Sequence, residues 1–89
     1  MTHPQIITIL GSTGSIGKST LDVLARHPQQ FAVYALTAST QVDVMLAQCA
    51  QFKPEVAVMV HEPAALVLAE KLKAEGLKTE VRWGAAALD

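Results

Sequence analysis

Residues 6–17 read IITILGSTGSIG, and this stretch decides the fold. It opens with a nearly continuous apolar, β-branched run, which is typical of a strand covered on both faces in a parallel sheet. Three glycines follow at Gly11, Gly14 and Gly17, in the spacing GxxGxxG. A glycine-rich turn that joins a first strand to a first helix is the pattern of a dinucleotide-binding βαβ unit. The stretch therefore predicts a strand, a phosphate-binding turn and a helix.

Strand and helix patterns alternate along the rest of the chain. The expected strands are Ile6–Leu10, Phe31–Ala38, Glu55–Val60 and Thr79–Trp83. The expected helices are Ser15–Arg26, Val42–Phe52 and His61–Gly76, with Gly76 as the C-terminal cap of the last one. Residues Gly84–Asp89 resemble the start of a further helix. Strands that alternate with helices form right-handed βαβ crossovers. We expect an α/β fold with a Rossmann-like parallel sheet, βαβαβαβ, that is incomplete. The first strand should lie at one edge, with the second, third and fourth strands following in that order.

The three glycines have separate expected roles. Gly11 would allow the sharp turn, Gly14 would let the backbone approach a pyrophosphate, and Gly17 would let helix and strand pack closely. Free N–H groups at the helix start would then bind an anion without a basic side chain. Hydroxyl donors at this turn would be Ser12, Thr13 and Ser15. The alternative is a strand-to-helix turn that is rich in glycine for structural reasons only.

A second nucleotide-binding pattern overlaps the same turn. Residues 17–20 read GKST, which resembles the end of the triphosphatase loop GxxxxGK[ST]. The spacing disagrees, because Ser12 stands where that loop needs its first glycine and Gly11 comes one residue too early. We therefore interpret Lys18 as a solvated helix residue and keep the triphosphatase loop as an alternative.

The end of the second strand informs the choice of cofactor. In NAD-binding folds an acidic residue here binds the ribose hydroxyls. This chain has Ser39, Thr40 and Gln41 instead, which favours NADP over NAD although no basic residue is present for the 2′-phosphate. The alternative is that Ser39 or Thr40 only caps the second helix.

Composition narrows the classes of partner and compartment. A formal net charge of −1 with interspersed acids and bases predicts neither nucleic acid nor a membrane surface as a partner. The single cysteine, Cys49, reads as a small buried hydrophobe, which is consistent with a reducing cytoplasm. His3, His27 and His61 show no metal-binding spacing. Trp83 is expected to anchor the core or the sheet edge.

The chain resembles the 1-deoxy-D-xylulose 5-phosphate reductoisomerase family. The residues that carry the resemblance are ILGSTGSIG at 9–17, STLDV at 19–23, FKPEVAVM at 52–59 and TEV at 79–81. The resemblance implies an enzyme of non-mevalonate isoprenoid biosynthesis that depends on NADPH and on Mg or Mn. Such an enzyme converts 1-deoxy-D-xylulose 5-phosphate to 2-C-methyl-D-erythritol 4-phosphate, as a full-length homodimer. Residues 1–89 would be the N-terminal part of its NADPH-binding domain.

The resemblance also implies which residues contact the cofactor. These are Thr13, Gly14, Ser15 and Ile16 together with the loop Ser39, Thr40 and Gln41, while Gly11 and Gly17 shape the turn. That loop departs from the family pattern of a glycine, a variable and often basic residue, and an asparagine. The metal ligands and the contacts to the sugar phosphate would lie beyond residue 89, so we expect the chain alone not to be catalytic. A non-catalytic α/β interaction module that retains the glycine turn is the alternative function.

Overall fold

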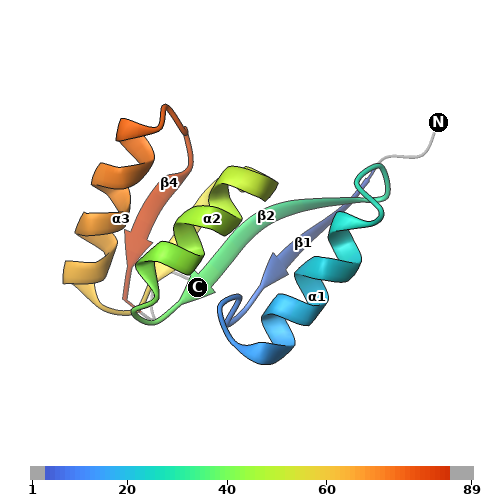
Figure 1. The fold of residues 1–89 in the computed structure, drawn as a ribbon, viewed down its shortest axis with the longest axis horizontal. Coiled ribbons are helices and arrows are strands. Elements are labelled where there is room, and N and C mark those ends of the chain that lie inside the picture. The colour runs from blue at the N-terminus through green and yellow to red at the C-terminus, as the bar shows by residue number, and fades with distance from the viewer. Residues whose placement is uncertain (1–3, 85–89) are drawn as a thin grey trace.

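The computed structural model of the chain describes residues 4–84, in which four parallel strands alternate with three helices (Figure 1). The elements are β1 (Gln5–Ile9), α1 (Ser15–Ala25), β2 (Phe31–Ala38), α2 (Val42–Phe52), β3 (Val56–Met59), α3 (Glu62–Ala74) and β4 (Glu80–Trp83). The predicted α/β, Rossmann-like fold class is confirmed. The helix start expected after Gly84 lies outside the described residues.

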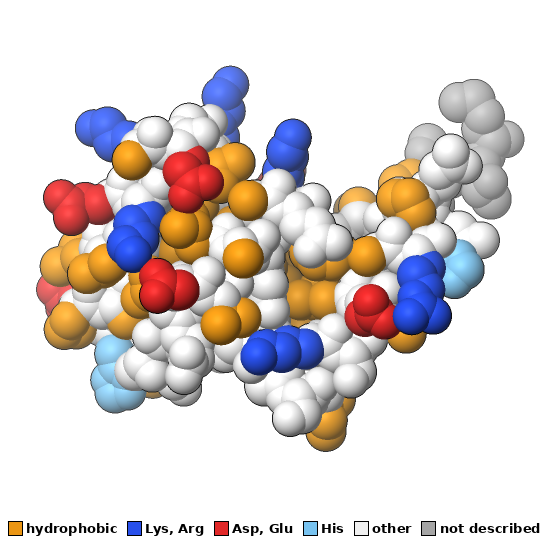
Figure 2. Space-filling view, viewed as in Figure 1, with side chains coloured by type: hydrophobic (Ala, Val, Ile, Leu, Met, Phe, Trp, Pro, Cys, Tyr) orange, Lys and Arg blue, Asp and Glu red, His pale blue; other side chains and the backbone are white. Residues whose placement is uncertain are grey.

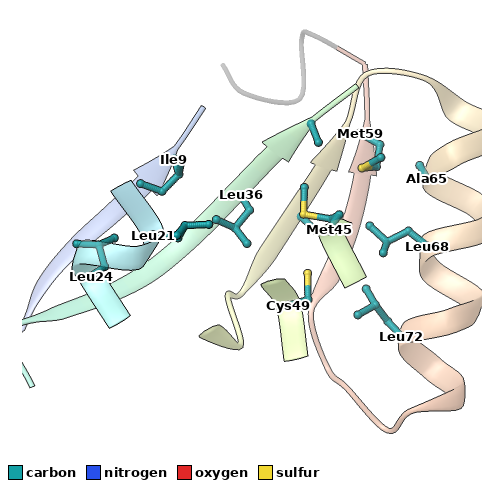
Figure 3. Packing of buried hydrophobic residues seen from close by; sticks show 12 residues of the cluster. Ile9, Leu21, Leu24, Leu36, Met45, Cys49, Met59, Ala65, Leu68 and Leu72 are labelled. Atoms are coloured by element: carbon teal, nitrogen blue, oxygen red, sulfur yellow. The ribbon is translucent and has the colours of Figure 1, made fainter. Parts of the chain in front are cut away.

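The strand order is β1-β2-β3-β4, so the predicted order is confirmed and β1 forms an edge of the sheet. Each crossover moves one strand further in the same direction. Because such crossovers are right-handed, successive ones place their helices on the same face of the sheet. Side chains from all three helices accordingly join a single hydrophobic core over that face, as Figure 3 shows.

The expectation that β1 is covered on both faces is wrong for the described residues. Ile7 and Ile9 face the helices, but Ile6 is 71% exposed on the opposite face and Thr8 is also exposed. Leu10, expected as the last strand residue, lies in the turn and is 69% exposed. Only Thr8 interrupts the apolar run, so the pattern gives little indication of which face has a helix over it.

The pairing of β1 with β2 contains an irregularity at Tyr34. Ile7 pairs with Val33 and Thr8 pairs with Ala35, so Tyr34 has no partner in β1. A bulge of this kind shifts the alternation of side chains along the strand. Before the bulge, Phe31 and Val33 face the helices; after it, Leu36 and Ala38 do.

The core is built from aliphatic and sulfur-containing side chains. Its largest fully buried members are Leu36, Met45, Met59, Leu68, Leu72 and Cys49. Burial raises the pKa of the Cys49 thiol from its ordinary 9.0 to about 11, because the charged thiolate would lose its solvation. Trp83, expected as an anchor, lies at the end of the edge strand β4 with 51% of its surface exposed, so it is not a core residue.

Gly76 ends α3 as predicted. It has a φ of +73° directly after the last helical residues, and its N–H donates to the Lys73 carbonyl. The Leu77 N–H donates to the Leu72 carbonyl at 2.9 Å, which completes a Schellman motif. Leu77 also packs against the core. The motif turns the chain sharply from α3 towards β4.

Candidate functional site

The glycine turn and the loop after β2 lie at the same edge of the sheet. Because β1 and β2 are parallel, their carboxyl ends meet there, and both chain segments leave the sheet side by side (Figure 1). The Ser12 N–H donates to the Thr37 carbonyl at 2.8 Å, which attaches the turn to the end of β2. Ligands of open α/β sheets bind outside this carboxyl edge.

A larger hollow on the surface lies elsewhere. Figure 2 shows the face that carries α1 and α2 hollowed between these helices, with hydrophobic side chains at its floor. This cavity of about 540 Å³ is lined by Leu24, Phe31, Val33 and Phe52, among others, at the amino-terminal start of β2. It lacks the convergent backbone N–H groups of the glycine turn. We therefore place the candidate site at the carboxyl edge.

Gly11 makes the sharp turn after β1. Its φ of +67° lies in the left-handed region that favours glycine. Its N–H donates to the Thr37 Oγ1 at 2.9 Å, and its carbonyl accepts a hydrogen bond from the Gly14 N–H at 3.1 Å. The backbone thus folds back on itself within four residues, 11–14, and enters α1.

Gly17 provides the close contact between helix and turn. A Cβ at this position would lie 2.7 Å from the Ser12 Cα and 2.9 Å from the Ser12 carbonyl carbon, and it would clash with the Gly11 carbonyl oxygen as well. All three neighbours are backbone atoms, which cannot move aside as a flexible side chain can. Gly14 differs, because a Cβ there would meet the Gly11 oxygen at an ordinary 3.5 Å. The fold therefore requires glycine at position 17 more than at position 14.

The N-terminus of α1 has backbone donors without a side-chain cap. Gly14 is the N-cap residue, with extended backbone, and no acidic residue lies in the first turn. The first helical hydrogen bond runs from the Lys18 N–H to the Gly14 carbonyl at 2.9 Å. The N–H groups of Ser15, Ile16 and Gly17 precede that bond and point out of the helix end, where the helix dipole favours an anion.

The predicted contact residues of this turn differ in exposure. Gly14, Ser15 and Ile16 are exposed, and Thr13 is half-buried. The expectation that the Ser12 hydroxyl donates to a ligand is wrong. Ser12 is fully buried, and its Oγ donates to the Met45 sulfur at 4.0 Å. A one-dimensional pattern of hydroxyl residues does not show which of them points into the core.

The loop after β2 is also open to solvent. Ser39, Thr40 and Gln41 are all exposed. The N-cap of α2 is Gln41 and it makes no side-chain capping bond, so the alternative in which Ser39 or Thr40 serves only as a cap is not what the structure shows. Asp43 follows in the first turn of α2 and pairs with Lys71 of α3 at 3.1 Å.

Two residues that hold the turn were not anticipated. Thr37 accepts the Gly11 N–H, and the buried Gln48 donates its Nε2 to the Ser12 carbonyl at 2.8 Å. A polar residue at the end of an apolar strand was a visible signal for Thr37. The Gln48 contact spans 36 residues and had no such signal.

Residues 7–89 match the family model described as 1-deoxy-D-xylulose 5-phosphate reductoisomerase. The chain belongs to this reductoisomerase family. The turn, α1 and the last three residues of β1 lie within the matched residues. The exposed position of Lys18 in α1 is consistent with its interpretation as a solvated helix residue.

Individual reductoisomerases are similar over nearly the whole chain. That of Janthinobacterium sp. (strain Marseille) is 58% identical over 84 residues, which cover 94% of this chain and 22% of the relative. That of Tolumonas auensis is 55% identical over 84 residues, covering 94% of this chain and 21% of the relative. The chain thus spans about a fifth of the length of these curated relatives.

Solved reductoisomerase structures share the fold. The enzyme from Zymomonas mobilis in complex with NADPH has a TM-score of 0.90 at 36% identity, with 99% of this chain and 23% of that chain covered. A reductoisomerase in complex with NADPH, fosmidomycin and magnesium has a TM-score of 0.89 at 36% identity, with 94% and 20% covered.

Residues 4–84 contain neither a cluster of metal-binding side chains nor a helix suited to span a membrane. In that part of the chain, no three His, Cys, Asp or Glu side chains come together as a metal-ion site would require. The described residues therefore do not fit a magnesium ion such as the reductoisomerase structures contain. None of the described helices has the length and apolar character of a membrane span.

Proposed function

We propose that this chain is the N-terminal part of the NADPH-binding domain of a 1-deoxy-D-xylulose 5-phosphate reductoisomerase, with residues 1–89 in that one domain. One observation carries the proposal: the N-terminus of α1 has no side-chain cap, and Gly17 lets the glycine turn pack directly against it. Family membership and the likeness to a reductoisomerase in complex with NADPH support it.

The glycine turn would bind the cofactor pyrophosphate. The backbone of Thr13, Gly14, Ser15 and Ile16 would surround its oxygens, with the N–H groups of Thr13, Ser15 and Ile16 as donors and with Gly11 and Gly17 shaping the turn. Gly14 has no side chain to separate the phosphates from the backbone. NADPH supplies a hydride when it is bound, and the part played by this chain is to bind and orient it.

The loop after β2 would bind the adenosine ribose and its 2′-phosphate. Ser39, Thr40 and Gln41 offer exposed hydroxyl and amide donors, and none of them carries a carboxylate that would repel the phosphate. The nearest acid along the chain, Asp43, is paired with Lys71. The loop would therefore favour NADPH over NADH through uncharged donors.

The complete enzyme would convert 1-deoxy-D-xylulose 5-phosphate to 2-C-methyl-D-erythritol 4-phosphate in isoprenoid biosynthesis. Its metal ligands, for Mg or Mn, and its contacts to the sugar phosphate would come from residues outside this chain, so these 89 residues alone would bind cofactor without catalysis. We place the full-length enzyme in the cytoplasm as a homodimer, with neither nucleic acid nor membrane as a partner.

A fluorescence titration of the chain with NADPH and with NADH tests this function. We expect saturable binding of NADPH and weaker binding of NADH. The affinity for NADPH should be modest, because the nicotinamide half of the site is not part of this chain. Absence of binding for both cofactors would contradict the proposal and favour a non-catalytic interaction module.

A further inference from the structure

Gln48 is the buried polar side chain of α2 that contacts the glycine turn. It is 8% exposed, and its Nε2 donates to the Ser12 carbonyl at 2.8 Å. Its Oε1 is also buried and has no hydrogen-bond partner among the described residues. One end of this amide is therefore satisfied and the other end is not.

Stability alone does not account for an amide at this position. The neighbouring buried positions of α2 are Met45 and Cys49, so Gln48 lies on the core-facing side of the helix. A buried acceptor without a donor destabilises the folded state. An apolar side chain would remove that penalty at Oε1 but would leave the buried Ser12 carbonyl without its donor, so the net effect of the amide on stability is small. The amide is explained instead by what its Nε2 holds in place.

The bond to Ser12 sets the direction of the next backbone N–H. In a planar trans peptide the carbonyl of one residue and the N–H of the following residue point in opposite directions. No described peptide bond is cis. By holding the Ser12 carbonyl towards α2, Gln48 turns the Thr13 N–H away from α2. Thr37 fixes the preceding two N–H groups, those of Gly11 and Ser12, from the β2 side.

We propose that Gln48 is a positioning residue for NADPH: it orients the Ser12–Thr13 peptide so that the Thr13 N–H faces the pyrophosphate. This inference rests on the proposed function of the turn. Gln48 itself does not touch the cofactor. Its contribution is to fix the backbone of the glycine turn before NADPH arrives, which reduces the ordering that binding requires.

The variant Gln48→Met separates this role from a purely structural one. It preserves the shape of the side chain, removes the unpartnered Oε1 and releases the Ser12 carbonyl. We expect the Kd for NADPH to rise about tenfold while the midpoint of urea unfolding changes little, because losing the donor to the buried Ser12 carbonyl offsets losing the unpartnered Oε1. Gln51→Met is the matched control, because Gln51 is exposed one turn further along α2 and lines, together with Gln48, a second and smaller cavity between α1 and α2. It should change neither quantity.

The variant Gln48→Glu adds a pH-dependent readout. A protonated carboxyl can donate to the Ser12 carbonyl, whereas a carboxylate can only repel it. Burial raises the pKa of a carboxyl group towards neutrality. The ratio of the variant Kd to the wild-type Kd should therefore rise between about pH 6 and about pH 8. Lys18 and Asp22 of α1 line the small cavity that Gln48 also lines, and Cys49 is the next residue of α2. All three are present in both proteins, so the ratio isolates the new group.

The outcomes distinguish the two proposals. If the wild-type chain does not bind NADPH, the proposed function itself is overturned. If the wild-type chain binds and Gln48→Met binds equally well, or loses only unfolding stability, the role of Gln48 is overturned and the function stands. Should Gln48→Met fail to fold, a flat pH dependence of the Gln48→Glu ratio overturns the role, and a rising one supports it.

Discussion

Gly17 faces the carbonyl oxygen of Gly11 so closely that no side-chain carbon fits between them. The first turn of α1 rests directly on the backbone of the glycine turn. We expect Gly17→Ala to destabilise the fold by at least ~2 kcal/mol, because the added Cβ meets only backbone atoms. Gly14→Ala is the control, since its Cβ would make an ordinary contact. Urea unfolding of both variants measures the difference, and equal stabilities would contradict the close packing.

Cofactor preference should depend on the charge of the loop after β2. Ser39→Asp adds a carboxylate where NAD-binding folds have one, so we expect preference to change from NADPH to NADH, with NADPH affinity falling at least ~10-fold. Ser39 is exposed, so the substitution should leave the unfolding midpoint unchanged. Ser39→Asn, of similar size without charge, is the control. An unchanged ratio of the two dissociation constants would show that this loop does not read the 2′-phosphate.

Stability should fall at high pH through Cys49. Its pKa is raised to about 11 in the folded chain, above the ordinary 9.0 of the unfolded chain. The folded state therefore keeps the thiol proton to higher pH than the unfolded state. The contribution of the buried thiol to the free energy of unfolding is fully present below pH 9.0 and is lost as pH rises towards 11. The loss should reach about 2–3 kcal/mol. Unfolding at several pH values in this window, compared with Cys49→Ala, isolates the thiol; parallel curves for both proteins would argue against its burial.

Lys53 ends α2 in a conformation that suits glycine. Its φ is +49°, in the left-handed region, and its N–H donates to the Cys49 carbonyl. Lys53→Gly should therefore stabilise the chain by ~0.5–1 kcal/mol, because glycine adopts this conformation without the clash of a Cβ. Lys73→Gly, inside α3, should instead destabilise by ~1 kcal/mol. Thermal unfolding compares the two, and a loss of stability in both would refute the argument.

Much of the fold was predictable because its element boundaries carry local signals. β2 spans Phe31–Ala38 and α2 spans Val42–Phe52, the bounds predicted from apolar patterning and from Pro54. The faces of the strands were not predictable. Thr8 is the one weak signal of the exposed face of β1, and the exposure of Ile6 and the bulge at Tyr34 leave no mark on the pattern.

The candidate site divides in the same way. The spacing of Gly11, Gly14 and Gly17 specified where the turn lies, because positive φ and close packing are properties of single residues. The burial of Ser12 and its bond to Gln48 depend on how α2 packs beside the turn, which is a tertiary contact. Contacts between residues so far apart in the sequence depend on how the helices pack on the sheet, so the sequence pattern does not predict them.

Mapping NADPH onto the backbone amides of the chain tests the central claim most directly. In a titration followed by ¹H–¹⁵N correlation spectra, we expect the largest shifts at Thr13, Gly14, Ser15 and Ile16, with a second group at Ser39–Gln41. Gly14→Val should retain the spectrum of a folded protein and lose these shifts, because its side chain occupies the approach to the amides. Shifts confined to α3, or full binding by Gly14→Val, would contradict a pyrophosphate site at the start of α1.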